Sequence, residues 1–131
     1  MYQKPIFSPG GCVEVCDALC PGVFQVGAED GVGTLVSLDV SAALSPAARK
    51  CGFRVGRYLC YEEYQEDVVL RELLDKGLWR VPARVRDPAA FVENIDRFVR
   101  AYSPAYWRSR QRGQEAARAH ARPAPVLGEA R

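Results

Sequence analysis

The sequence predicts an α+β fold in which a small N-terminal antiparallel sheet of two to four strands is followed by three or four helices and an extended C-terminal arm. Three observations favour this order. Residues 12–40 contain short stretches with the alternation of strands, residues 58–78 carry apolar side chains at helical spacing, and proline marks two later helix starts. Strands that precede helices, rather than alternate with them, disfavour a doubly wound parallel sheet.

The bulk composition is that of a globular protein with one core. The chain has 131 residues, of which 48% are hydrophobic and 26% charged. We expect an extended arm over residues 1–11, a single α+β domain over 12–102, and a basic helical arm with a disordered tail over 103–131. No run is long and apolar enough for a membrane span, and the first residues lack the apolar region of a secretory signal. We therefore expect an intracellular protein, cytoplasmic or within an assembled particle.

Three stretches predict strands. Residues 12–16 alternate with both cysteines on one face, and residues 23–26 and 33–40 are rich in β-branched and aromatic side chains. The last two are separated by a turn with Asp30-Gly31 in it, which predicts a hairpin.

The helical half begins with a short helix that Ser41 or Ser45 opens and that ends at residue 50. Residues 58–78 then predict one amphipathic helix of about 20 residues, whose C-terminal cap is Gly77. Asp87-Pro88 starts a further helix, and Ser103-Pro104 starts another that runs over residues 105–121.

The cysteines form the sharpest local motif, C-x3-C-x3-C-Pro. Thiolates are good ligands for zinc and for iron–sulfur clusters, and four of them would come from Cys12, Cys16, Cys20 and Cys51. The alternative interpretation is that these are reduced, buried thiols without a metal, which an odd count of five favours.

Residues 16–39 resemble one stretch of bacterial ferredoxins, in which C-x3-C-Pro is followed by a hydrophobic strand, an acidic turn and a second strand. The resemblance implies an iron–sulfur electron carrier. It covers about a fifth of the chain, and the C-x2-C-x2-C run that precedes the Cys-Pro in that family is missing here.

Other catalytic constellations lack their essential residues. The one histidine, His120, lies in the polar tail, so a Cys–His pair would require the tail to fold back. No phosphate-binding glycine motif precedes a helix. The acids of residues 62–67 are typical of a solvated helix face. We therefore expect no enzymatic activity.

The C-terminal arm combines aromatic and basic side chains, and we expect it to bind a partner. Residues 97–131 contain eight arginines and two glutamates, a net +6, which leaves −4 for residues 1–96 of the total +2. Tyrosine, tryptophan and arginine are the usual anchors of protein interfaces, and here they are Tyr106, Trp107, Arg108, Arg110 and Arg112. Nucleic acid is the weaker alternative, because the body of the domain is acidic.

These patterns lead to one interpretation and one alternative. We expect a non-enzymatic structural or interaction subunit of a larger macromolecular assembly, without a cofactor, that docks onto other protein subunits through the basic aromatic arm. The alternative is an iron–sulfur or zinc protein that uses the N-terminal cysteines.

Overall fold

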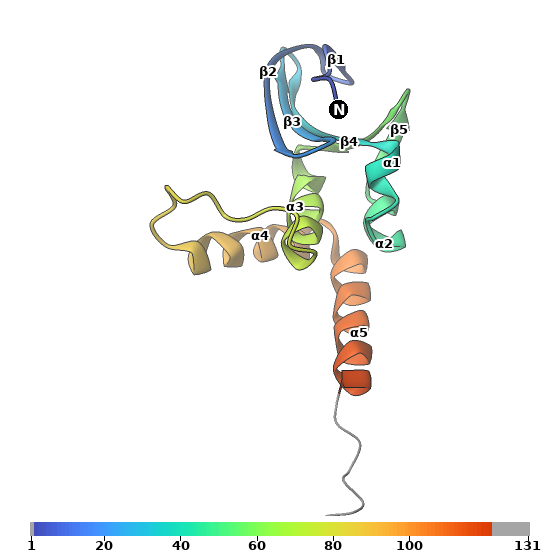
Figure 1. Cartoon of the computed structure of the whole chain (residues 1–131), viewed down its shortest axis with the longest axis vertical. Helices are drawn as coiled ribbons and strands as arrows, with labels where there is room; N and C mark the ends of the chain where they lie inside the picture. The colour runs from blue at the N-terminus through green and yellow to red at the C-terminus, as the bar shows by residue number, and fades with distance from the viewer. Residues whose placement is uncertain (1, 122–131) are drawn as a thin grey trace, which may run out of the picture.

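Six antiparallel strands form one curled sheet, about half of a barrel, and the longer helices lie outside the curl (Figure 1). The computed structural model describes residues 2–121. The strands lie in the order β1-β2-β3-β4-β6-β5. Their bounds are Phe7–Ser8 (β1), Gly11–Cys20 (β2), Val23–Ala28 (β3), Gly31–Ser37 (β4), Phe53–Val55 (β5) and Tyr58–Glu62 (β6). The prediction of a small sheet of two to four strands followed by helices is therefore wrong.

The sheet is larger than predicted because two of its strands come after helical turns. The helices α1 (Leu38–Ser41) and α2 (Pro46–Lys50) interrupt the sheet, and the chain then returns to it as β5 and β6. A tight turn joins these two strands at Gly56, whose φ of 59° lies in the left-handed region that glycine adopts without strain. β6 pairs with β4 on one side and with β5 on the other.

Residues 58–78 do not form one helix. The strand β6 is followed by the short 3₁₀ helix η1 (Glu63–Gln65), and α3 covers only Glu66–Asp75. The spacing of Tyr61, Tyr64 and Val68 imitates a helix across this boundary. Inside β6, however, consecutive side chains are buried on opposite faces of the sheet. A strand buried on both faces gives a short continuous apolar run, and from sequence alone such a run looks the same as a segment of a buried helix.

The predicted helix ends that depend on local chemistry are confirmed. Ser45 and Asp87 cap α2 and α4 (Pro88–Tyr102) by accepting hydrogen bonds from backbone amides three residues later. Gly77, with a φ of 68°, ends α3 in a motif in which the Leu78 amide donates to the carbonyl of Leu73. The last helix, α5, covers Pro104–Ala121.

Both faces of the sheet are buried, in two different ways. The outer face packs on the helices and forms the main core, in which Val23, Val36 and Tyr61 meet Val69 and Leu73 of α3. The concave face carries a smaller apolar cluster, which consists of Phe24, Val26, Leu35 and Cys60.

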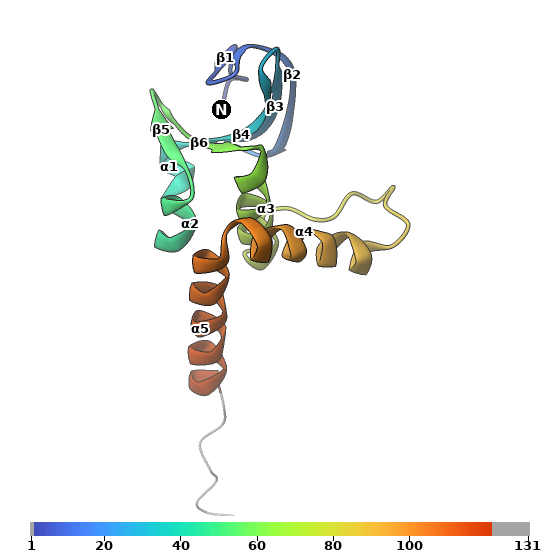
Figure 2. The same cartoon turned by 180° about the vertical axis from the view of Figure 1, so that it is seen from behind.

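The segment ahead of β1 lies within the curl of the sheet (Figures 1 and 2). Pro5 is buried there, and Lys4 Nζ donates to the Cys16 carbonyl at 3.4 Å. Part of the stretch predicted as an N-terminal arm thus covers the concave face. Among residues 2–121 the structure contains no helix that meets the length and apolarity of a membrane span.

Candidate functional site

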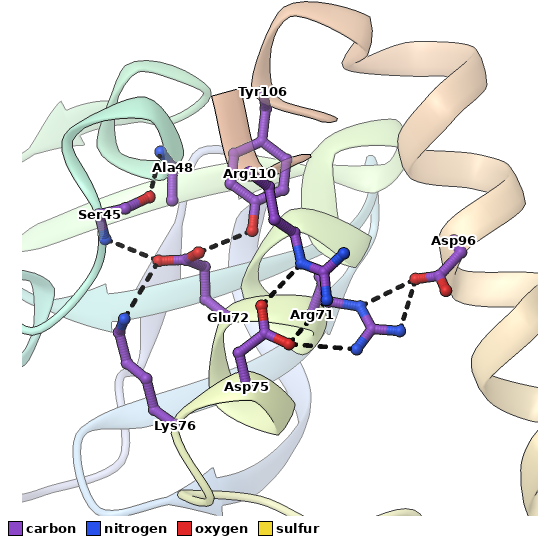
Figure 3. Close-up of polar contacts among 9 residues, drawn as sticks. All are labelled: Ser45, Ala48, Arg71, Glu72, Asp75, Lys76, Asp96, Tyr106 and Arg110. Atoms are coloured by element: carbon purple, nitrogen blue, oxygen red, sulfur yellow. Dashed lines mark hydrogen bonds and ion pairs between the residues drawn. The ribbon is translucent and has the colours of Figure 1, made fainter. Parts of the chain in front are cut away.

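A buried carboxylate, Glu72, joins α5 to the body of the domain (Figure 3). Its side chain accepts a hydrogen bond from Tyr106 Oη at 2.7 Å and another from the Ser45 amide at 2.6 Å. Glu72 and Tyr106 are only 4% and 3% exposed. Burial raises the pKa of Tyr106, and the hydrogen bond that its hydroxyl donates to the Glu72 carboxylate raises that pKa further. The phenol therefore stays protonated as a donor, and α2, α3 and α5 share one polar contact.

A chain of ion pairs continues from this contact along the same side of α3 (Figure 3). Arg110 of α5 donates to both carboxylate oxygens of Asp75, at 2.7 and 2.9 Å. Arg71 contacts the same carboxylate and also pairs with Asp96 of α4 at 2.7 Å. Burial acts to raise the pKa of Asp75, but the two arginines outweigh it and hold that pKa below its usual value. The three helices are thus tied together by charges.

The five residues predicted to contact a partner divide into two groups. Tyr106 is buried, and the guanidinium of Arg110 lies over the half-buried ring of Trp107, 5.1 Å from its centroid. Arg108 and Arg112 are exposed. The aromatic half of the predicted arm therefore packs against the body of the same chain, and the remaining arginines face outward.

The second half of α5 extends away from the body (Figures 1 and 2). Residues 111–121 are all exposed. The rest of the predicted tail, residues 122–131, lies outside the described part of the chain. α5 is thus a helix that is held firmly at its first turns and that presents its second half to the surroundings.

Sequence reasoning missed Glu72. Its hydrogen-bond partners Ser45 and Tyr106 lie 27 and 34 residues away in the chain. No pattern within a short window of sequence indicates contacts between residues so far apart in the chain. The sequence contained one weak signal. Tyr106 was recognised as an anchor of the arm, and if such a tyrosine is buried its hydroxyl needs a hydrogen-bond acceptor such as a carboxylate.

The four cysteines proposed as metal ligands are spread over the sheet and α2. Cys12, Cys16 and Cys20 all lie in β2, where residues four apart are separated by roughly 13 Å. Cys51 follows α2 and packs against the main core. Within residues 2–121 no three side chains of cysteine, histidine, aspartate or glutamate come together as a metal site. The arrangement does not bring the proposed ligand set together.

Four of the five thiols lie in surroundings that make them poor nucleophiles. Burial raises the pKa values of Cys16, Cys20, Cys51 and Cys60 above the usual thiol range. Since the thiolate is the reactive form, this shift lowers their reactivity at neutral pH.

A hollow of about 480 Å³ opens at the mouth of the half-barrel, and we call it the acidic hollow. Its apolar floor is made by side chains of the concave face, and its rim is formed by the turn before β4, the end of β6 and η1. The floor contains Val26, Leu35, Phe53 and Cys60, and the rim contains Asp30, Glu62, Glu63 and Tyr64. None of the described residues that line it is basic.

A second, shallower hollow of about 420 Å³ lies on the outer face of β2–β4, beside the start of α3. Glu66 lines it and accepts a hydrogen bond from Thr34 Oγ1 at 2.8 Å. Burial raises the pKa of Glu66 to about 7, although the bond from Thr34 acts in the opposite direction. Burial likewise raises the pKa of the adjacent Asp67 to about 6. Folding therefore favours the protonated forms of both carboxyl groups.

We expect the protein to lose stability as the pH rises from about 4.5 to about 7, because Glu66 binds its proton more tightly when folded than when unfolded. Glu66→Gln should remove most of this slope and stabilise the protein at pH 8 by roughly 1–3 kcal/mol. Urea unfolding at several pH values measures both effects. In Glu66→Gln, Asp67 leaves a smaller dependence of stability on pH with the same sign. Glu115→Gln, at an exposed position on α5, is the control. An unchanged slope in Glu66→Gln would contradict the assignment.

Comparison of the chain with protein-family models, with curated proteins and with solved structures gave no match.

Proposed function

We propose that this protein is a non-enzymatic interaction subunit of a larger protein assembly, and that the exposed second half of α5 is the element that it presents to other subunits. The observation that carries the proposal is the contrast within α5. Its first turns are fixed by Tyr106 and Arg110, and residues 111–121 are all exposed.

Fixing the base of a projecting helix reduces the conformational freedom that a partner must remove on binding. A pre-organised element binds with less loss of entropy than a loose tail of the same sequence. Arg112 and Arg118 provide exposed positive charge on this part of α5. Arginine suits this role because its planar guanidinium pairs with carboxylates through two parallel hydrogen bonds.

A chain that ends at Gln111 tests whether the projecting half serves binding or folding. We expect its free energy of unfolding to stay within about 0.5 kcal/mol of the full chain, because the deleted part of α5 is exposed. Chemical denaturation followed by circular dichroism measures this. A large loss of stability would assign a structural role to the distal helix and contradict the proposal.

Binding itself is tested in the native cells with a photo-crosslinking amino acid at Ala116, in the exposed half of α5. We expect a discrete cross-linked protein from this position and none from Glu93, an exposed position on α4. Cross-linking to nucleic acid alone, or none from Ala116, would overturn the proposal.

A further inference from the structure

We propose that the acidic hollow receives Arg108 and Arg112 of α5 from a second copy of this chain, so that the copies associate head to tail. This inference rests on the proposed function and names its partner.

The lining of the acidic hollow fits a long basic side chain. Asp30, Glu62 and Glu63 supply carboxylates at the rim, and all three are exposed. Phe53 and Leu35 supply apolar surface below them. An arginine can place its methylene stem on such a floor while its guanidinium meets the carboxylates. Because no described basic residue lines the hollow, its carboxylates have no cation of their own there.

Residues 108–112 of α5 carry the matching charges. Arg108 and Arg112 are exposed and four residues apart, so both project from one face of the helix. Arg110, by contrast, is bound to Asp75 within the chain. A body of net charge −4 over residues 1–96 and a C-terminal part of +6 are complementary between copies.

The direction of α5 makes the contact intermolecular. The helix α5 runs away from the curled sheet, and the two elements lie at opposite ends of the described part of the chain (Figures 1 and 2). A bond between helix and hollow therefore joins two chains through unlike surfaces. Such a heterologous contact leaves one free helix and one free hollow at the ends, and it produces rings or filaments rather than closed dimers.

Sedimentation velocity of the full-length protein tests this directly. At 50 mM salt we expect the average mass to rise with protein concentration beyond that of a dimer, and to fall again at 0.5 M salt, where charges are screened. A monomer at all concentrations, or a dimer that never grows, would overturn the inference.

Charge reversal on each surface identifies the contact. We expect Arg108→Glu/Arg112→Glu, and separately Asp30→Lys/Glu62→Lys/Glu63→Lys, to be monomeric, with association weakened by about tenfold or more. These positions are exposed, so the thermal transition should not change. Glu63→Lys alone is the milder second variant. Arg84→Glu/Arg86→Glu, also at exposed positions, is the matched control and should still assemble.

A mixture of the two reversed proteins gives the sharpest result. The first retains a native hollow and the second a native helix, and the reversed helix of the first also carries the charge opposite to that of the reversed hollow of the second. The mixture should therefore associate although neither protein does so alone. Absence of association in the mixture, or continued assembly of either variant alone, would overturn the inference. If Ala116 cross-links to a different protein while the purified chain stays monomeric, the proposed function stands and this inference falls.

Discussion

Replacement of Glu72 by leucine is expected to lower the free energy of unfolding by about 3–5 kcal/mol. The change removes the acceptor for the Ser45 amide and for the Tyr106 hydroxyl, and a buried donor without a partner retains its full desolvation cost. Urea unfolding measures the loss. Hydrogen exchange should show that α5 loses protection first, because Glu72 joins it to α2 and α3.

Three further variants separate this interaction from a general effect of removing a charge. Tyr106→Phe should cost about 1.5–3 kcal/mol, since it removes one hydrogen bond to a charged group. The double variant Glu72→Leu/Tyr106→Phe should be more stable than the sum of the two single changes predicts. Glu93→Ala, which removes an exposed ion pair with Arg100, should cost at most about 1 kcal/mol. If Glu72→Leu were as mild as Glu93→Ala, the buried network would not hold α5.

Truncation of Tyr61 to alanine is expected to destabilise the protein by about 3–5 kcal/mol. Tyr61 is 1% exposed in β6, packs in the main core, and donates its hydroxyl to the Ala48 carbonyl at 2.7 Å. The change therefore leaves a cavity between the sheet and the helices. It also removes one of two hydrogen bonds to the Ala48 carbonyl, which keeps the bond from the Cys51 amide at 3.1 Å. Thermal and chemical unfolding measure the loss.

Two controls connect this result to the boundary between β6 and η1. Tyr61→Phe keeps the ring and should cost about 1–2 kcal/mol for the hydrogen bond. Tyr64→Ala should cost about 1 kcal/mol, because Tyr64 is 53% exposed and packs only at the surface, where its ring is tilted against that of Tyr102 at a centroid distance of 4.6 Å. Equal losses at Tyr61 and Tyr64 are what one continuous buried helical stripe would produce, and they would contradict the structure.

The elements that sequence reasoning located correctly are those whose signals are local. The caps at Ser45 and Asp87 bond to amides three residues away, and Gly77 ends α3 through its own backbone conformation. The hairpin of β3 and β4 likewise has its turn at Glu29 and Asp30, between two alternating stretches. Such features are visible in a window of a few residues.

The candidate site was predictable only in part. The arginines and aromatic residues of the arm were recognised by composition, and α5 is indeed helical over Pro104–Ala121. Composition could not show that Tyr106 is buried against Glu72 while Arg112 is exposed. Burial depends on which helix packs beside which, and that arrangement joins residues more than 30 positions apart.

By itself, the sequence determined the local features of this protein: the capped helices, the β3–β4 hairpin and an acidic body that carries a basic C-terminal part. Tertiary structure alone decided that residues 58–62 join a six-stranded curled sheet, and that α5 is fixed at one end and exposed at the other. The physical reason is that strand pairing and carboxylate burial are long-range events. Their free energy depends on partners that no short window of sequence contains.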